Sequence, residues 1–297
     1  MADVLARVGS SLIQHGPESD RIYGMKMAEE DMPEILDELE AMGREAGYGK
    51  LFVKSRSRFH SEFEARGYIA EATVPHFYGL GEDGVFMGKF LDPQRATPSR
   101  PERVREVLRV AEEEGRTAAP QPDSILSTEV SLAAPVPGMR IREATLADAE
   151  ALAACYDQVF DSYPFPINDP LHLREEQEGG TRFFTAWEDE ALVAASSMEA
   201  GGAPGAVEMT DFATLPSHRG RGLATHLLAL MDRAARKTGQ RVAYTIARAV
   251  SFGMNITFAR RGYRFAGTLV NNTQISGDIE SMNVWYKLLS SPTTSRS

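Results

Sequence analysis

The sequence predicts an α/β protein with a mixed central sheet, and two observations carry this prediction. From Met139 onward, runs of alternating apolar and polar residues, typical of strands, are interleaved with runs in which apolar residues recur every three or four positions, typical of helices. Elements in that order pack as helices against a sheet. The second observation is that residues 20–91 follow part of the same order in a shorter form.

The elements of the carboxyl-terminal part follow in order from these two periodicities, 2 for strands and about 3.6 for helices. In chain order we expect a strand at 139–145, helices at 146–160 and 171–180, a hairpin at 181–188 and 191–200, a strand at 206–215, a helix at 222–239, a strand at 240–249, a helix at 251–262, and strands at 263–272 and 281–289.

The amino-terminal part contains a short copy of this pattern. The run from Leu51 to Leu91 reads as strand, helix, Gly-Tyr, strand and hairpin strand, and "FEARGY" (63–68) has the same type and phase as "FARRGY" (258–263). We therefore expect residues 20–91 to be a degenerate copy of the second half of the later domain. The alternative is that both runs are ordinary helix-to-strand connections through a glycine.

One glycine pattern in this region has a misleading form. "GLGEDG" (79–84) fits G-x-G-x-x-G, but a dinucleotide site needs a helix after it, and "VFMGKFL" alternates like a strand. We therefore predict a hairpin turn.

Composition divides the chain. The stretch 92–138 is rich in Pro and small residues and contains one charged helix, for which Pro101 suits the first turn and Gly115 the end. With 297 residues, 42% of them hydrophobic, the chain is long enough for two modest cores. We expect an amino-terminal domain at 1–91, a linker with a helix at 92–138, a larger domain at 139–292 and a flexible tail at 293–297.

The bulk properties exclude several classes of function. A formal net charge of −10 argues against nucleic-acid binding. No run approaches the roughly 20 apolar residues of a membrane span, and the start of the chain lacks the apolar stretch of a signal peptide. The single cysteine, Cys155, and six histidines without metal-binding spacing predict no metal. We expect a cytoplasmic protein.

The stretch "HRGRGLATHLL" (218–228) carries the strongest functional signal. Gly220 and Gly222 let a ligand approach the backbone, and the following helix offers free N–H groups and a partial positive charge. Arg219 and Arg221 add charge and forked donors. An acidic protein that concentrates these groups at one helix start is predicted to bind a diphosphate there.

This stretch resembles the acyl-CoA-binding motif of the GNAT superfamily of N-acyltransferases. The superfamily pattern Gln/Arg-x-x-Gly-x-Gly/Ala is matched by Arg219, Gly222 and Ala224, and "NITFARRGYRF" resembles the helix that contacts CoA. The resemblance implies a mixed, largely antiparallel sheet flanked by helices, a half-copy of that fold at the amino terminus, and acetyl-CoA as co-substrate. It implies CoA contacts from Ala213, Leu215, Arg219, Gly220, Arg221, Gly222, Leu223, Ala224, Asn255 and Phe258.

Acetyl transfer to an amine needs the neutral amine. Supplying it at pH 7 from an ammonium with a pKa of about 10.4 costs roughly 4.6 kcal/mol, which rewards a general base. Glu208 resembles the base glutamate of some superfamily members, and Asp211 is the second candidate, or the anchor of a substrate ammonium. Their spacing puts the two carboxylates on opposite strand faces unless a bulge intervenes.

The sequence does not single out the acid that protonates the leaving thiolate. In relatives a Tyr stands four residues before the Gly of the CoA-contacting helix, and here that residue is Phe258. Tyr263, Tyr286 or water remain as candidates.

Three stretches, at 11–27, 245–269 and 271–287, resemble the β-lysine N6-acetyltransferase family along nearly the whole chain. The resemblance implies β-lysine as acceptor and the compatible solute N6-acetyl-β-lysine as product. Such a substrate needs donors for its carboxylate and acceptors for its β-ammonium. The predicted binding residues are Tyr23, Arg248, Asn271, Asn272, Glu280 and Asn283.

Other interpretations stay open at this point. The acceptor could be a polyamine, an aminoglycoside, another amino acid or a protein lysine, or the chain could be a non-catalytic acyl-CoA-binding module. We expect a small-molecule amine and CoA as partners, without nucleic acid or membrane, and the oligomeric state, a homodimer included, is left open.

Overall fold

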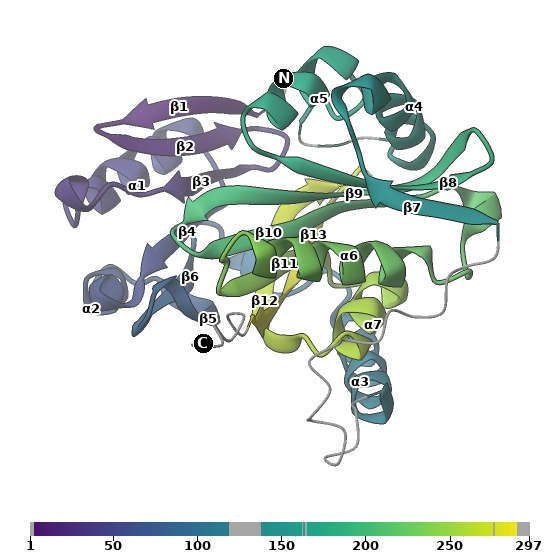
Figure 1. The fold of residues 1–297 in the computed structure, drawn as a ribbon. Coiled ribbons are helices and arrows are strands. Elements are labelled where there is room, and N and C mark those ends of the chain that lie inside the picture. Colours follow the sequence, from purple (N-terminus) through teal and green to yellow (C-terminus); the bar gives the residue numbers. More distant parts are fainter. Residues whose placement is uncertain (1–2, 119–137, 162, 164, 276, 290–297) are drawn as a thin grey trace, which may run out of the picture.

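The computed structural model describes residues 3–118, 138–161, 163, 165–275 and 277–289. Within them, 13 strands form one continuous sheet in the order β1-β2-β3-β4-β6-β5-β12-β13-β11-β10-β9-β8-β7. The amino-terminal half of the chain supplies one side of this order and the carboxyl-terminal half supplies the other (Figure 1). The predicted α/β class with a mixed sheet is confirmed.

The carboxyl-terminal half follows the predicted order of elements. Its sheet is antiparallel except for the parallel pair β10 and β11. Its strands are β7 (Met139–Glu143), β8 (Arg182–Glu188), β9 (Ala191–Ala203), β10 (Ala206–Thr214), β11 (Val242–Arg248), β12 (Arg264–Ile275) and β13 (Asp278–Leu288). Its helices are α4 (Ala149–Val159), α5 (Pro170–Glu178), α6 (Leu223–Lys237) and α7 (Phe252–Arg260).

Two separate hydrophobic clusters cover the two faces of this half. On one face α6 and α7 bury a stripe that includes Leu227, Met231 and Phe258 against Val207 and Met209 of β10. On the other face α4 and α5 pack on β8 and β9 (Figure 1). Each helix is amphipathic, so burial of its apolar stripe fixes which way it faces.

The amino-terminal half has the same architecture without counterparts of β7, α4 and α5. Its elements are β1 (Val4–Val8), β2 (Ser11–Gly16), β3 (Arg21–Lys26), α1 (Ile35–Ala46), β4 (Lys50–Arg56), α2 (His60–Glu64), β5 (Ile69–Gly79) and β6 (Glu82–Phe90). β1 and β2 were not among the predicted strands. The "GLGEDG" stretch forms the predicted hairpin turn between β5 and β6.

The series β3-α1-β4-α2-β5-β6 repeats the series β10-α6-β11-α7-β12-β13, with strand orders β3-β4-β6-β5 and β10-β11-β13-β12. The two matching sequence stretches also have the same local geometry. The rings of Phe63 and Tyr68 lie 5.1 Å apart, as do those of Phe258 and Tyr263. The glycine before each Tyr has a positive φ, 76° at Gly67 and 78° at Gly262.

The two halves join between β5 and β12, where Gly267 pairs with Ala72. A Cβ on Gly267 would lie 2.0 Å from the carbonyl oxygen of Glu71, so only glycine fits this approach. Beyond the junction the sheet curls. Tyr244 of β11 packs against the rings of Phe77 and Phe86 although β6 stands four strands away in the sheet order. The inner faces of the two halves therefore pack on each other through one apolar cluster.

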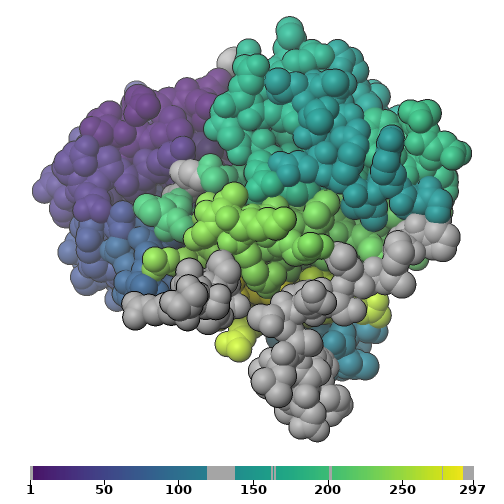
Figure 2. Space-filling model, in the orientation of Figure 1, coloured from purple at the N-terminus to yellow at the C-terminus, as the bar shows by residue number. Residues whose placement is uncertain are grey.

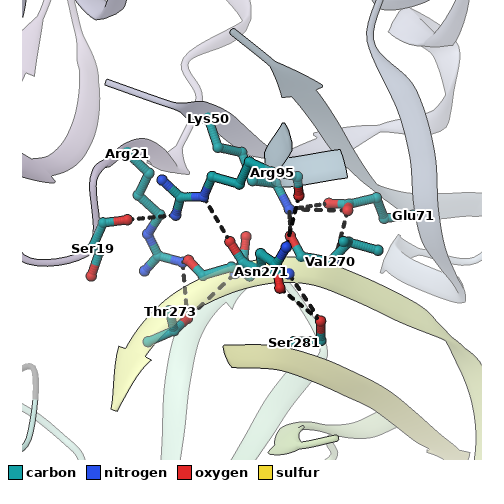
Figure 3. A network of polar contacts seen from close by, with 10 residues as sticks. Ser19, Arg21, Lys50, Glu71, Arg95, Val270, Asn271, Thr273 and Ser281 are labelled. Carbon is teal, nitrogen blue, oxygen red and sulfur yellow. Dashed lines mark hydrogen bonds and ion pairs between the residues drawn. The ribbon is translucent and has the colours of Figure 1, made fainter. Parts of the chain in front are cut away.

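A buried polar network fastens the junction (Figure 3). A bulge in β12 turns three consecutive carbonyl groups away from the β12–β13 ladder, and each accepts a hydrogen bond from a buried cation of the amino-terminal half. The pairs are Lys50 Nζ to Val270 O at 2.8 Å, Arg95 Nε to Asn271 O at 3.0 Å, and Arg21 Nη1 to Asn272 O. Glu71 neutralises Lys50 at 2.7 Å and also accepts from Val270 N.

The predicted linker helix is α3 (Pro101–Ala118), and it packs along α7. The predicted end of this helix was wrong, because the helix continues through Gly115 to Ala118. A Cβ on Gly115 would lie 3.1 Å from Ala259 of α7, so this glycine serves close helix packing. The rest of the linker, 119–137, and the predicted tail at 293–297 lie outside the described residues.

Candidate active site

Strands β10 and β11 separate beside the predicted motif. They pair only from Ala206 to Glu208 with Val242 to Tyr244, whereas β10 continues to Thr214 along β9. Past Glu208, the edge of β10 that faced β11 has backbone N–H and C=O groups without a neighbouring strand. Such groups need partners, and an extended amide-containing ligand supplies them. The opening between the two strands is therefore suited to the pantetheine arm of CoA.

The loop from β10 into α6 has the backbone that the motif predicted. Gly220 and Gly222 have φ values of 79° and 74°, a region that disfavours residues with a Cβ, and Gly222 caps the amino terminus of α6. The first N–H groups of α6 and its dipole point out of this cap. The geometry fits a diphosphate bound by main-chain amides.

The arginines of this loop are already engaged in part. Arg221 pairs with Glu188 at 2.9 Å, and Arg219 Nε donates to the carbonyl of Thr214 at 3.2 Å. Both side chains are exposed, so each can turn to a bound anion. Of the other predicted CoA contacts, Ala213 and Leu223 are buried in the core, and only their backbone can reach a ligand.

Glu208 lies on the inner face of the sheet, turned toward the amino-terminal half. Its Oε2 accepts a hydrogen bond from Tyr244 Oη at 2.7 Å and lies 3.9 Å from Nζ of Lys54 on β4. Although burial lowers the pKa of Lys54, the neighbouring Tyr23, Tyr244 and Glu208 outweigh that effect and hold it well above its usual value. A glutamate at the strand opening faces a buried cation contributed by the other half.

Asp211 lies on the same face as Glu208 because a bulge intervenes. The β9–β10 register shifts between Thr210 and Ala213, and Asp211 itself has a φ of 53°. Val207, Met209 and Phe212 consequently pack on the α6 side, while both carboxylates point the other way. The expectation of opposite faces, which held only for a regular strand, does not apply here.

The carboxylate of Asp211 is buried and hydrogen-bonded. It accepts from Ser197 Oγ at 2.6 Å and from Tyr163 Oη. Burial raises the pKa of Asp211, although these two hydrogen bonds oppose the rise. Glu199, opposite Glu208 in the β9–β10 register, is a third acid in this group. Burial, together with the charges of Asp211 and Glu208, raises the pKa of Glu199 well above its usual range.

A cavity of about 440 Å³ lies between the two halves beside Asp211. Tyr163, which bonds Asp211, also lines it, and so does Tyr156, whose buried Oη has no hydrogen-bond partner among the described residues. Its other lining residues come from the start of the chain through β1, from β2, from the end of α4 and from the segment after α4. They are Asp3, Leu5, Gln14, Asp157, Phe160, Asp161, Phe165, Pro166, Ile167 and Asn168. The wall is aromatic and acidic, a chemistry that suits small cationic amines.

Two residues predicted to serve CoA or catalysis lie in the core instead. Tyr263 is 4% exposed and donates to Asp232 of α6 at 2.8 Å, on the sheet face opposite Glu208. It cannot protonate a thiolate from there. Phe258 packs between Phe212 and Tyr263 and is equally buried. Tyr286, the alternative acid, pairs with Tyr244 across β11 and β13 and stays a candidate.

Asn255 was expected to contact the pantetheine arm, and its environment does not allow that. It is fully buried and uses all four hydrogen-bonding positions of its amide within the protein. Its Nδ2 donates to the carbonyls of Arg248 and Ser251, and its Oδ1 accepts from Asn283 Nδ2 and Trp285 Nε1. Asn255 thus joins α7 to β11 and β13.

Most residues predicted to bind the acceptor lie elsewhere. Arg248 and Glu280 form a bidentate pair with two contacts of 2.8 Å. Asn283 is buried beside Asn255. The side-chain Nδ2 of Asn271 donates hydrogen bonds to the backbone carbonyls of Arg95 and Thr97.

Asn272 lies in the buried polar network at the junction, where its carbonyl oxygen accepts from Arg21 Nη1. Of the residues predicted to bind the acceptor, Tyr23 lies near the acidic group of Glu199, Glu208 and Asp211. Its ring centre is 5.3 Å from Nζ of Lys54, the partner of Glu208.

Sequence reasoning missed Lys54, Tyr163, Glu199 and Tyr244. One signal was present, since Lys54 interrupts the apolar run "LFVKSRS" and Glu199 follows the apolar run of β9. In the described part of the chain, no group of three His, Cys, Asp or Glu side chains could hold a metal ion. No helix of that part is long and apolar enough to cross a membrane.

Comparison with known proteins agrees with this geometry. Residues 149–263 match the Acetyltransferase (GNAT) family. The chain is 35% identical to the β-lysine N(6)-acetyltransferase of Methanococcus maripaludis, over 96% of this chain and 98% of the relative. It is 27% identical to the enzyme of the same name from Methanosarcina mazei, over 86% of this chain and 97% of the relative.

Among solved structures, a GNAT superfamily phosphinothricin acetyltransferase from Sinorhizobium meliloti, in complex with acetyl-CoA, is 16% identical. It superposes with a TM-score of 0.46 over 54% of this chain and 92% of its own. The family match and the full-length relative, together with the glycine loop and the strand opening, lead to one conclusion. The chain belongs to the GNAT family of acetyltransferases, and it is an N-acetyltransferase that uses acetyl-CoA.

Proposed function

We propose that this enzyme acetylates the N6 amine of β-lysine, with Glu208 as general base. The observation that carries the proposal is an acidic pocket, the group of Glu199, Glu208 and Asp211 beside the cavity between the two halves, in which Lys54 is paired with Glu208. β-Lysine has two ammonium groups and one carboxylate, so it brings the positive charge that this pocket lacks. The relatives named β-lysine N(6)-acetyltransferase support the same acceptor, since their likeness includes the amino-terminal half.

Glu208 is the base because of where it stands. It lies at the last paired position before β10 and β11 separate, beside the opening that suits pantetheine. When bound, acetyl-CoA supplies an acetyl group on a good thiolate leaving group. Glu208 removes a proton from the ammonium, directly or through a water, and so provides the neutral nucleophile. The loop amides and the start of α6 hold the diphosphate meanwhile.

Asp211 and Tyr163 then anchor the second ammonium of the substrate. Asp211 is held by Ser197 and by Tyr163, which lines the cavity, so its carboxylate is fixed beside the cavity wall. The unpartnered hydroxyl of Tyr156 offers a further polar contact in the same wall. Fixed partners at one end of a diamine set how far the other amine reaches toward Glu208.

The test is a substrate panel with acetyl-CoA at a fixed concentration. β-Lysine should exceed α-lysine, spermidine and an aminoglycoside in kcat/KM, because only β-lysine combines the required charges at the right spacing. Glu208→Gln should lower kcat for β-lysine about 100-fold or more and recover in part at high pH, where the free amine needs no base. A polyamine as best substrate would overturn the acceptor, and full activity in the Glu208→Gln variant would overturn the base.

A further inference from the structure

Lys54 is the feature of this pocket that general-base catalysis does not explain. It comes from β4 of the amino-terminal half, and its side chain is 7% exposed. Its Nζ lies 3.3 Å from Tyr244 Oη and 3.9 Å from Glu208 Oε2, and 5.3 and 5.6 Å from the ring centres of Tyr23 and Tyr244. Burying an ammonium is costly unless it is paired, so its position next to the base calls for a functional reason.

The hydrogen-bond chemistry of the three side chains allows one arrangement. A lysine ammonium has only donors, so Tyr244 Oη must accept from Lys54. The single proton of the Tyr244 hydroxyl is then directed at Glu208 Oε2, 2.7 Å away. Tyr244 and Lys54 both contact Oε2 of Glu208. The other oxygen, Oε1, is therefore the one that accepts the proton of the amine. The chain from Lys54 through Tyr244 to Glu208 thus fixes the orientation of the carboxylate.

We propose that Lys54 is a positioning residue for acetyl transfer, and that the amino-terminal half thereby completes the catalytic centre of the other half. Lys54 holds the Tyr244 hydroxyl and, through it and its own contact with Oε2, keeps the Glu208 carboxylate correctly turned. The inference rests on the proposed role of Glu208 as base. It assigns to the amino-terminal half a task in the chemical step, beyond covering the acceptor.

The experiment compares Lys54→Met, Lys54→Gln and Lys54→Arg in the full chain, with acetyl-CoA and β-lysine as substrates. Lys54→Met should lower kcat about 10- to 100-fold with less than about a threefold change in KM for acetyl-CoA. Lys54→Arg should restore a measurable part of kcat. Lys26→Met, at an exposed lysine of β3, is the matched control and should match wild type.

Coupling separates this inference from the proposed function. In a Glu208→Gln background, Lys54→Met should cause little further loss, because the group it positions is gone. Wild-type kcat in Lys54→Met, while Glu208→Gln loses about 100-fold, would overturn the positioning role and leave the proposed base intact. If Lys54→Met fails to fold, Lys54→Gln gives the same two outcomes, since its amide cannot supply the charge. Full activity in Glu208→Gln would instead overturn the proposed base, on which this inference rests.

Discussion

The two halves of this protein share one order of elements and differ at the loop that follows their first parallel strand. In the carboxyl-terminal half, "LPSHRGRG" (215–222) leads into α6 with two positive-φ glycines and two arginines. In the amino-terminal half, "MAEEDMPE" (27–34) leads into α1 with no glycine or arginine and three consecutive acids. An acidic loop repels a diphosphate. The fold alone therefore does not make a CoA site, since the same scaffold carries it once and lacks it once.

A second difference concerns the parallel strand pairs themselves. In the carboxyl-terminal half, the third residue of β10, Glu208, is the register partner of the third residue of β11, Tyr244. In the amino-terminal half, the equivalent pair is Tyr23 of β3 and Phe52 of β4. The amino-terminal half thus has no carboxylate at the position where the other half has Glu208, the proposed base. It contributes Lys54 instead, two residues further along β4. The amino-terminal half lies against the carboxyl-terminal half (Figure 2), and the inner faces of the two halves pack on each other through one apolar cluster.

The largest effect should come from the loop glycines. Gly222→Val should raise the Kd for acetyl-CoA at least about 100-fold, because a β-branched residue cannot keep the φ of 74° that aims the amides of α6. The measurement is calorimetric titration with acetyl-CoA. The matched control is Gly47→Val at the end of α1, where φ is 73°. It should cost about 1 to 2 kcal/mol of stability and leave acetyl-CoA binding unchanged. Equal loss of binding in both variants would contradict the assignment.

Asn255 should show the next largest effect, on stability. Asn255→Leu leaves two buried carbonyls, the Asn283 amide and the Trp285 indole without their partner, so we expect a loss of about 3 kcal/mol or more in urea unfolding. The corresponding residue of the other half, three positions before the Phe of the ring pair, is His60, which forms only an exposed pair with Glu64. His60→Leu should change stability by less than about 0.5 kcal/mol. A stable Asn255→Leu protein with weakened CoA binding would restore the original interpretation.

Asp148 tests a segment that only the carboxyl-terminal half possesses. Its carboxylate pairs with Arg142 through two contacts of 2.7 Å and caps the turn at Thr145. Hydrogen bonds from Arg142 and Thr145 lower its pKa to about 2. Since this pKa lies below that of the unfolded chain, the stabilisation is present above about pH 4 and is lost as pH falls toward 2. Asp148→Asn should cost about 1 to 2 kcal/mol at pH 7 and little at pH 2, measured by thermal unfolding.

The parts that the sequence predicted are those with a local cause. Alternation fixed the strands of the carboxyl-terminal half, and the Gly220 and Gly222 loop was recognisable because its backbone requirement is local. β1 was missed because it is an exposed edge strand with an irregular pattern, and β2 was missed because its buried residues do not alternate regularly with its half-buried ones.

The composition of the acceptor site was out of reach for a related reason. Lys54 and Glu208 are 154 positions apart, and only the curl of the sheet brings them together. Asn255 shows the converse error. A polar residue at a helix start is compatible with a ligand contact and with a buried hydrogen-bond centre, and only the packing of α7 on β13 decides between them.

The smallest effects should come from Tyr263 and Tyr68, which occupy equivalent positions in the two halves. The two residues differ in whether the hydroxyl oxygen has a hydrogen-bond partner. Tyr263 Oη donates to Asp232, whereas Tyr68 Oη is buried without a partner among the described residues. Tyr263→Phe should therefore cost about 1 kcal/mol, since Asp232 keeps its 2.8 Å pair with Lys287. Tyr68→Phe removes an unsatisfied hydroxyl and should be neutral or slightly stabilising. Urea unfolding measures both, and kcat for Tyr263→Phe should stay within about twofold of wild type. That expectation follows because a hydroxyl confined to the α6 face has no path to the thiolate. A large fall in kcat would return Tyr263 to the list of catalytic acids.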